Sequence, residues 1–494
     1  MRDSLSPPKS DKKICVVGAG VSGLRAAGLL AAAGFQVTVL EARDRVGGRV
    51  RQSSQLGGRP VDVGASWIHG EEGNPIVALA ERTQTTTIPC GAVDSICDSK
   101  GAWLDRDLAR GYYEEVWEIL DLAMDKSRQE FASLSDSAKM MDFFRAEVHS
   151  RRSSQGKQTD DYYETLMLQI VEMWGAFMGD ECERQSLKNM WLVDDLEGDN
   201  LLVASTYEGI LESILSAVTD NAIVKLNCEV TKIENNSVGT VDIEAAGRTQ
   251  GTFDDVIVTA PLGWLKRSDN VFVPPLGSRM KTAIRSLGYG SLEKVFIRFP
   301  EAFWDDSIRH DKDPSFPIES LFLSPAYAND TNPARWRTEI ISFSGLPEPL
   351  AQPVIMFFVY GQWGRHITGL VRGMSHDSEE YHQILDEHFR PYYSKLPNYD
   401  LGSAECKPVA YTSTDWQNDR FAGYGSFTNC PVNAGDCAEH YEVFREGMGE
   451  DRGIWFAGEH TSPPRGLGTV TGAYWSGEEA ARSVAKRHRV IIDE

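Results

Sequence analysis

Apolar runs and glycines alternate over the first fifty residues of the chain. An apolar run over residues 14–17 is followed by Gly18, Gly20 and Gly23, and then by the helix-forming stretch LRAAGLLAAAG. A second apolar run, FQVTVL, comes next and ends beside Glu41. Short apolar runs bounded by glycine are typical of buried strands, and the stretch between them has the length of a helix. The pattern therefore predicts a strand, a helix and a second strand, a βαβ unit.

The glycine spacing within this unit predicts a dinucleotide site. Gly18 would make the tight turn, Gly20 would let the backbone approach a pyrophosphate at the helix N-terminus, and Gly23 would allow the helix to pack on the strand. Glu41 lies roughly 20 residues further on, where an acid accepts a hydrogen bond from a ribose hydroxyl. Because glycine turns are common, a turn without a ligand is the alternative.

The pattern changes twice further along the chain. Residues 104–202 contain long helical segments, whose aromatic and leucine positions we expect in the core rather than in contact with a ligand. Strand patterns return in AIVKLNCEVTKIE and TFDDVIVTAPLGWLK, which we expect to add strands to the first sheet, and a mixed region continues to about Cys406. The chain has 494 residues, which is more than one hydrophobic core usually supports, so two domains are expected.

Charge and composition limit the partners. Lys and Arg total 50 against 72 Asp and Glu, a formal net charge of -22, which disfavours nucleic acid and favours cationic ligands. No run of 18 apolar residues predicts a membrane span, and the polar start MRDSLSPPKSDKK is not typical of a signal peptide. The eight cysteines form no close pair, which argues against a zinc site and a disulfide framework. We expect a cytoplasmic protein without a metal.

Two further glycine-rich stretches decide which dinucleotide is bound. EARDRVGGR places Arg43, Gly48 and Arg49 where they could hold the phosphates from a second side. FAGEH ends an apolar strand on Gly458 and Glu459, and GTVTGA then begins a helix whose positive end could face an anion. Together with the first turn, these stretches resemble the flavin amine oxidase family, which includes monoamine oxidases, polyamine oxidases and lysine-specific histone demethylases.

The resemblance runs from about Lys12 to Lys486 and implies FAD as the cofactor. In the family, the residue matching Val230 holds the adenine through its backbone, and Glu459 matches the residue that bonds the ribityl chain. The amide of Val470 would meet the pyrimidine edge of the flavin, and Thr469 is also predicted to bind the cofactor.

Three residues are the candidates for catalysis. Lys294, in GYGSLEKVFIRF, matches the family lysine that holds a water against flavin N5, although a lysine at an apolar strand can also extend to the surface. His69, in SWIHG, matches a histidine beside the substrate channel of several polyamine oxidases, and it is either catalytic or structural. Phe427 is the nearby aromatic in a run similar to one in plant polyamine oxidases.

Within the family, the sequence departs from monoamine oxidases. Gly425 and Ser426 stand where those enzymes have the flavin-linking cysteine and a cage tyrosine, and Thr469 stands at the second cage tyrosine. The resemblance therefore implies non-covalent FAD and a pocket that is not a monoamine sandwich.

The expected fold class is α/β, with a Rossmann-like FAD-binding domain and an α+β substrate-binding domain of the amine oxidase type. Residues 12–90, 205–290 and 405–490 are predicted to form the first domain, and residues 91–204 and 291–404 the second. The resemblance leaves no room for a chromatin-binding module or coiled-coil tower, which argues against a histone demethylase.

The predicted function is oxidation of an aliphatic amine, first a polyamine such as spermine or spermidine. By the resemblance, hydride passes to flavin N5, the imine is hydrolysed, and molecular oxygen is the acceptor that yields hydrogen peroxide. The sequence leaves open a long-chain primary amine or an amine-bearing metabolite as substrate. A flavin-binding scaffold with little turnover and an NAD-dependent dehydrogenase are the alternatives from other classes.

Overall fold

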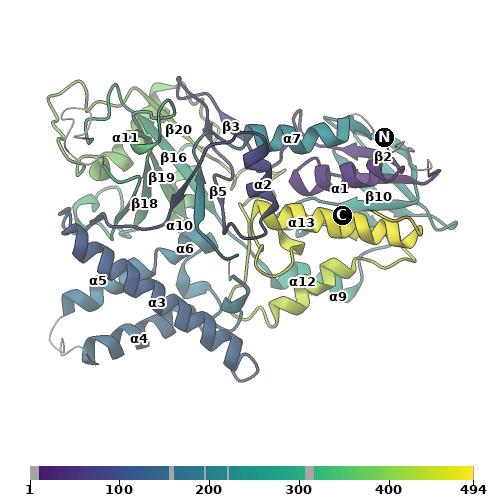
Figure 1. Ribbon diagram of the computed structural model, residues 1–494, viewed down its shortest axis with the longest axis horizontal. Helices are drawn as coiled ribbons and strands as arrows, with labels where there is room; N and C mark the ends of the chain where they lie inside the picture. Colours follow the sequence, from purple (N-terminus) through teal and green to yellow (C-terminus); the bar gives the residue numbers. More distant parts are fainter. Residues whose placement is uncertain (1–9, 155–160, 194–195, 220–221, 306–315, 493–494) are drawn as a thin grey trace, which may run out of the picture.

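The computed structural model describes residues 10–154, 161–193, 196–219, 222–305 and 316–492. A five-stranded parallel sheet forms the centre of one half of the molecule, drawn on the right of Figure 1. Its strands run in the order β22 (Ile454–Phe456), β13 (Asp255–Val258), β1 (Lys13–Val17), β2 (Gln36–Leu40) and β9 (Ala222–Lys225). Segments from three distant parts of the chain therefore share one sheet.

Three helices cover one face of this sheet. They are α1 (Val21–Ala32), α7 (Glu208–Thr219) and α13 (Val470–Arg487), and the first and last lie side by side in Figure 1 although they come from opposite ends of the chain. The predicted βαβ unit is present as β1, α1 and β2, and β1 pairs in parallel with both β2 and β13.

A four-stranded sheet packs against the other face. Its order is β12 (Arg248–Phe253), β11 (Val241–Ala245), β10 (Val230–Asn235) and β14 (Phe272–Val273). The stretch AIVKLNCEVTKIE thus contributes only β9 to the parallel sheet, so the expectation that all of it extends that sheet was wrong. The chain turns at Asn227, whose φ is 53°, and β10 then pairs antiparallel with β11.

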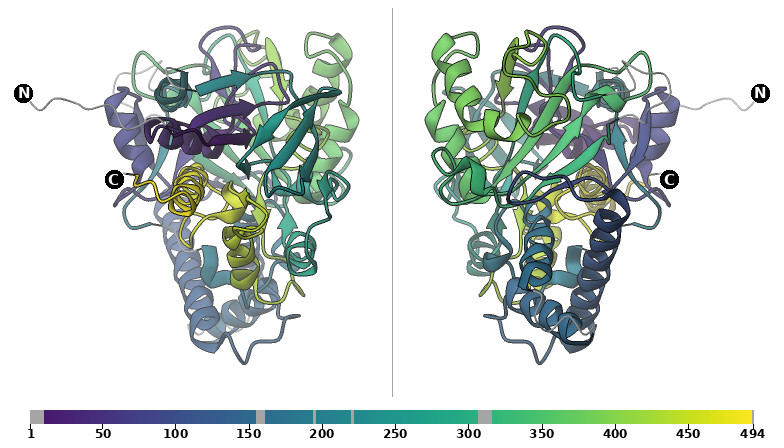
Figure 2. Two further views of the ribbon diagram at one scale, coloured as in Figure 1. Left: turned by 90° about the vertical axis from the view of Figure 1, so that its right-hand side faces the viewer. Right: turned by 90° about the vertical axis from the view of Figure 1, so that its left-hand side faces the viewer.

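A six-stranded sheet forms the other half of the molecule, and helices α10 (Gly361–Leu370) and α11 (Glu379–Tyr393) pack on it (Figures 1 and 2). Its order is β20 (Ala410–Ser413), β16 (Leu292–Arg298), β19 (Val354–Tyr360), β18 (Thr338–Ser342), β17 (Glu319–Phe322) and β7 (Ile96–Cys97). The segment 405–490, predicted for the FAD-binding domain, therefore supplies the edge strand β20 to this sheet.

Helices α3 (Arg106–Glu130), α4 (Met140–Ser154), α5 (Asp161–Val171) and α6 (Trp174–Met178) form a helical arm. The short α6 lies at its base against β19, and the arm extends to the bottom of Figure 2. Asp105 caps α3 by accepting hydrogen bonds from the amides of Asp107 and Leu108. Among the described residues, no helix has both the length and the apolar character that a membrane span needs.

Smaller elements connect the two halves. β8 (Asn200–Val203) pairs with β5 (Trp67–Ile68) and β6 (Thr87–Cys90), and α2 (Pro75–Arg82) lies next to them. The remaining elements are β3 (Gln52–Ser53), β4 (Val61–Asp62), α8 (Leu262–Leu265), α9 (Ser278–Ser286), β15 (Gly288–Tyr289), β21 (Thr428–Asn429) and α12 (Cys437–Glu446).

Candidate active site: a glycine-lined cradle and an aromatic cavity

A cavity of about 300 Å³ follows the ends of the parallel strands, and we call it the cradle. Gly18 has φ +109°, and a Cβ there would lie 2.5 Å from Thr259 Oγ1, so only glycine fits this turn. A Cβ on Gly23 would lie 2.1 Å from the carbonyl oxygen of Gly18. At Gly20 a Cβ would meet no atom within 4 Å. The first and third glycines are thus needed for packing, whereas the second keeps the space of the cradle open.

Glu41 ties the end of β2 to the glycine turn. One carboxylate oxygen accepts a hydrogen bond from the amide of Ala19 and the other from the amide of Arg43, each at 2.8 Å. The Arg43 guanidinium itself pairs with Asp419 at 2.8 Å. Glu41, Arg43 and Val230 all line the cradle, where the sequence predicted contacts to the adenosine.

The second glycine pair lies against the first turn. Gly20 and Gly47 form a backbone bridge, and a Cβ on Gly48 would lie 3.5 Å from the Cα of Gly20. The loop over residues 47–49 therefore closes the cradle beside the glycine turn.

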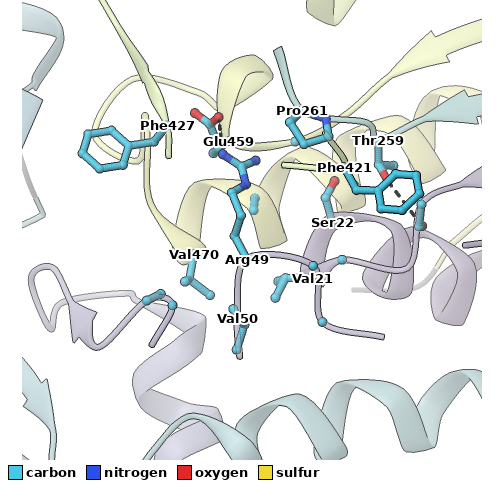
Figure 3. A pocket seen from close by; sticks show the side chains of 18 of the residues that line it. Val21, Ser22, Arg49, Val50, Thr259, Pro261, Phe421, Phe427, Glu459 and Val470 are labelled. Carbon is cyan, nitrogen blue, oxygen red and sulfur yellow. Dashed lines mark hydrogen bonds and ion pairs between the residues drawn. The ribbon is translucent and has the colours of Figure 1, made fainter. Parts of the chain in front are cut away.

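Arg49 and Glu459 form a partly buried ion pair in the wall of the cradle. Figure 3 shows Arg49 reaching toward Glu459, with Phe427 on one side. Arg49 Nη1 is 2.9 Å from Glu459 Oε1 and also donates to the carbonyl of Ser426 at 2.6 Å. Glu459, only 4% exposed, accepts two further hydrogen bonds from the amide and hydroxyl of Thr428. Burial alone would lower the pKa of Arg49, but Tyr289 and Glu459 outweigh it and raise that pKa.

The N-terminus of α13 faces the same cavity. The Thr469 side chain caps this helix by accepting from the amide of Gly472, and Val470 is its first residue. Gly458, Thr469 and Val470 all line the cradle. The positive end of an 18-residue helix therefore points at the cavity, where it would favour negative charge on a ligand.

Lys294 lies on β16 and is buried in the cradle wall, with 5% of its surface exposed. Its Nζ donates to the carbonyls of Asp62 at 3.1 Å and Gly64 at 2.6 Å, and to Ser66 Oγ at 2.8 Å. Burial lowers the pKa of Lys294 to about 8, against an opposing effect of Asp62. Because an ammonium has three donors, the protein itself accepts all of them. A water at Lys294 would replace one of these partners or bind the lone pair of the neutral amine.

A second cavity of about 180 Å³ adjoins the cradle, and we call it the aromatic cavity. It shares part of its wall with the cradle, and the shared residues are Trp67, His69, Leu292, Phe358, Phe427, Gly468 and Thr469. The helical arm supplies Tyr113, Trp117, Trp174 and Phe177 to its wall. The Trp174 and Phe177 rings stack with centroids 4.7 Å apart. Trp174 belongs to the buried core of this segment, as expected, and Tyr113 and Trp117 pack against that core, so these residues form core and cavity wall at once.

His69 lies where the two cavities meet. Asn200 Oδ1 accepts a hydrogen bond from the amide of Gly70 and also lies 3.2 Å from His69 Nδ1. An atom that accepts from an amide is an oxygen, so Nδ1 carries the proton. A neutral His69 thus has Nε2 as its acceptor. Asn200 has no recognisable signal in the sequence, because its place beside His69 depends on the pairing of β8 with β5.

Two acids in the wall of the aromatic cavity are also not predicted by any sequence pattern. Glu319 on β17 and Glu339 on β18 line the aromatic cavity. Their strands are apolar runs in which nothing marks a single acid as facing a cavity.

Residues 21–485 match the sequence model of the flavin containing amine oxidoreductases. The chain belongs to this family. FAD is accordingly its cofactor, and the cradle fits that group: Gly20 leaves open the space that a Cβ would fill, and the α13 N-terminus faces the same cavity.

Several relatives of this family member have names that record an activity. Probable polyamine oxidase 4 of Arabidopsis thaliana is 31% identical over 307 residues, 59% of each chain. Polyamine oxidase 4 of Oryza sativa subsp. japonica is 28% identical over 98% of this chain and 90% of its own. Lysine-specific histone demethylase 1 homolog 1 of Arabidopsis thaliana is 28% identical over 98% of this chain. This chain spans 53% of that demethylase homolog and 59% of the Arabidopsis polyamine oxidase.

A solved structure confirms the fold of this amine oxidoreductase. Cyclohexylamine oxidase from Brevibacterium oxydans IH-35A superposes with a TM-score of 0.71 over 97% of this chain and 100% of its own, at 19% identity. The predicted α/β fold class of the amine oxidase type is therefore correct.

Proposed function

We propose that the protein oxidises an aliphatic amine with FAD as the electron acceptor, and that a polyamine such as spermine or spermidine is the substrate. The observation that carries this proposal is the shared wall of the cradle and the aromatic cavity. A substrate in the aromatic cavity would meet a flavin in the cradle at His69, Phe358 and Phe427.

Bound FAD would supply the redox chemistry, in which hydride leaves the carbon next to the amine nitrogen and oxygen is reduced to hydrogen peroxide. The chain's own residues would bind and orient the substrate amine. Trp117, Trp174 and Phe177 offer apolar faces to the methylenes of an alkyl amine and exclude water. The same faces attract an ammonium through their quadrupoles. His69 Nε2 would accept a hydrogen bond from the reacting nitrogen.

Lys294 would hold the segment from Asp62 to Ser66 in the wall of the cradle. Its three bonds fix the segment Asp62 to Ser66 against β16, so the ammonium keeps the cavity wall in place. When the Lys294 side chain is neutral, its lone pair can accept a hydrogen bond from a water. We propose that this water lies beside the flavin.

The same oxidation would also be possible with other amines as substrates. A long-chain primary amine would fill the apolar walls equally well, and the names of several relatives include histone demethylases. A flavin scaffold with little turnover would show the same cradle. Family membership excludes only the NAD-dependent dehydrogenase.

The test is a panel of amines. Purified holoprotein would be mixed with spermine, spermidine, n-octylamine, a short monoamine and a dimethyl-lysine peptide, and hydrogen peroxide release would be recorded. Peroxide from the polyamines at the highest kcat/KM supports the proposal. Turnover of the peptide alone, or of no amine, contradicts it.

A further inference from the structure

Glu319 and Glu339 lie together on one face of the six-stranded sheet. β17 and β18 pair so that Glu319 faces Ile341 and Leu321 faces Glu339, which makes the two acids diagonal neighbours. Residues in this relation project on the same side and are within reach of each other. The two carboxyl groups share a hydrogen bond.

The pair is buried without a cationic partner. Glu319 is 9% exposed and Glu339 8%. In the described part of the chain, no ion pair to either carboxyl lies within 4.0 Å. Cys90 Sγ lies 3.6 Å from Glu319 Oε2, and Tyr113 lies close enough for both acids to raise its pKa, after the larger effect of burial. Two adjoining buried carboxyls cannot both ionise cheaply unless a cation joins them.

The sheet fixes how far the pair lies from the cradle. Lys294 on β16 pairs with Phe358 on β19, and its Nζ lies 5.8 Å from the centre of that ring. Ile340 pairs with Phe357, and continuing this register places Glu339 opposite Phe358. Lys294, Phe358 and Glu339 thus form one row across the sheet. With strands ~4.8 Å apart, the acids lie about 10 to 14 Å from the β16 end of the row.

One hydrogen-bond donor in the wall of the aromatic cavity has no acceptor among the described residues. Trp174 is 5% exposed and lines the aromatic cavity, and its Nε1 has no hydrogen-bond partner in the described residues. A buried indole N–H without an acceptor is costly, so this wall contains a donor that no described protein group satisfies. It is independent of the acids and belongs to the same cavity.

We propose that Glu319 and Glu339 bind a second cationic nitrogen of the substrate, and so select polyamines over monoamines. This inference rests on the proposed function, because the first nitrogen must react at the cradle. The distal ammonium would donate to both carboxyls and replace the proton that they share. A monoamine of equal length would bring a methyl group to the same place and leave the acids unpaired. A site built for a polar group rejects an analogue that lacks it more strongly than an apolar site rejects a polar one.

The test compares two substrates of one length in holoprotein, n-octylamine and the corresponding terminal diamine. The variants are Glu319→Gln, Glu339→Gln and the double variant. A separate variant, Glu301→Gln, is the control, because it removes one exposed charge. We expect the wild type to prefer the diamine by at least about tenfold in kcat/KM. The double variant should lose this preference through KM, with octylamine changed by less than about threefold. Equal losses for both substrates, or none, would overturn the proposal.

A second measurement does not depend on turnover. Binding of a terminal diamine whose α-carbons carry two methyl groups and no hydrogen, so that it keeps its N–H donors but cannot lose hydride, would be followed by tryptophan fluorescence against the monoamine of the same length and substitution. Wild type should bind the dication at least about tenfold more tightly, and the double variant should not discriminate. If no amine is oxidised but the dication preference is lost in the double variant, the acid site stands and the proposed function fails. If amines are oxidised and the variants bind both probes like wild type, the acid site fails alone. Folded variants are recognised by retained flavin and an unchanged melting temperature, and the single variants serve if the double variant does not fold.

Discussion

The cradle and the aromatic cavity share a wall, yet they are built in different ways. The cradle is made largely of backbone: glycines without a Cβ, the N-terminus of α13, and the glycine turn, where Glu41 accepts from the amide of Ala19. The aromatic cavity is made of side chains from the helical arm and from strands far apart in sequence. Backbone sites need a fixed local spacing, whereas side-chain sites need only the fold. The difference predicts where substitutions should act on cofactor binding and where they should act on substrate choice.

The largest effect is expected at Gly20, where the cradle depends on missing atoms. Gly20→Val should place its side chain in the open space and remove most bound FAD, which we would measure as the flavin absorbance per protein. Because a bound ligand stabilises the native state, the variant should also lose about 3 kcal/mol if FAD is normally present at about 100 times its Kd. Gly111→Val, at an exposed helix position with equally open surroundings, is the control and should keep its flavin. Full occupancy in Gly20→Val would disprove the assigned turn.

The next effect tests Lys294, which belongs to the cradle wall. Lys294→Met should retain FAD and slow flavin reduction or reoxidation by about 10 to 1,000-fold, or about 1.4 to 4 kcal/mol of barrier. Stopped-flow absorbance would follow the two half-reactions separately. Lys266→Met is a matched control, because Lys266 Nζ also donates three hydrogen bonds, in its case all to carbonyls, and its pKa is also lowered to about 8 by burial. It lies outside both cavities.

Both lysine variants leave buried carbonyls unpaired, so both should melt earlier. Only Lys294→Met should change the half-reactions. Wild-type rates in that variant, with a lowered melting temperature, would show that Lys294 is structural.

A smaller effect is expected at His69, on the shared wall. His69→Gln should lower kcat/KM for the preferred amine by about three- to tenfold, near the value of one hydrogen bond of about 1 kcal/mol. Flavin content should not change, since Asn200 still accepts from the amide of Gly70. His376→Gln is the control, because His376 is partly buried and bonds Thr412 at 3.0 Å outside both cavities. An unchanged kcat/KM with a lower melting temperature would make His69 structural.

The smallest effect concerns the attachment of the flavin. Acid precipitation should release all FAD into the supernatant, because Gly425 stands at the position of the linking cysteine. Cys430 lines the aromatic cavity, and its Sγ lies 3.6 Å from Tyr441 Oη. Cys430→Ser should therefore change nothing in this assay. Flavin that stays with the precipitate of wild type and leaves that of Cys430→Ser would identify a covalent bond to Cys430.

The residues of the cradle could be picked out in the sequence because they follow one another in short segments. Gly18, Gly20, Gly23 and Glu41 form a pattern whose spacing predicts their roles, and the predicted cofactor residues other than Gly23, which packs on Gly18, line one cavity. The strand pairing was harder to predict from the sequence. The chain leaves the parallel sheet after β9 and turns at Asn227, which has a positive φ, so that β10 pairs with β11 instead.

The aromatic cavity could not be predicted from the sequence. Trp174 and Phe177 have the helical spacing of core residues, and only the position of the arm over the sheet turns them toward a ligand. Glu319 and Glu339 meet because β17 and β18 pair in one register, which no local pattern reveals.

Anaerobic mixing of the holoprotein with spermine or spermidine tests the central claim most directly. Without oxygen, electrons taken from the amine stay on the flavin, so its visible absorbance reports oxidation of the substrate itself. The account predicts complete bleaching at a rate that saturates with polyamine concentration, followed by full recovery of colour and one equivalent of hydrogen peroxide when oxygen is admitted. A flavin that stays oxidised with every polyamine, in protein that holds its FAD, would contradict the proposed function.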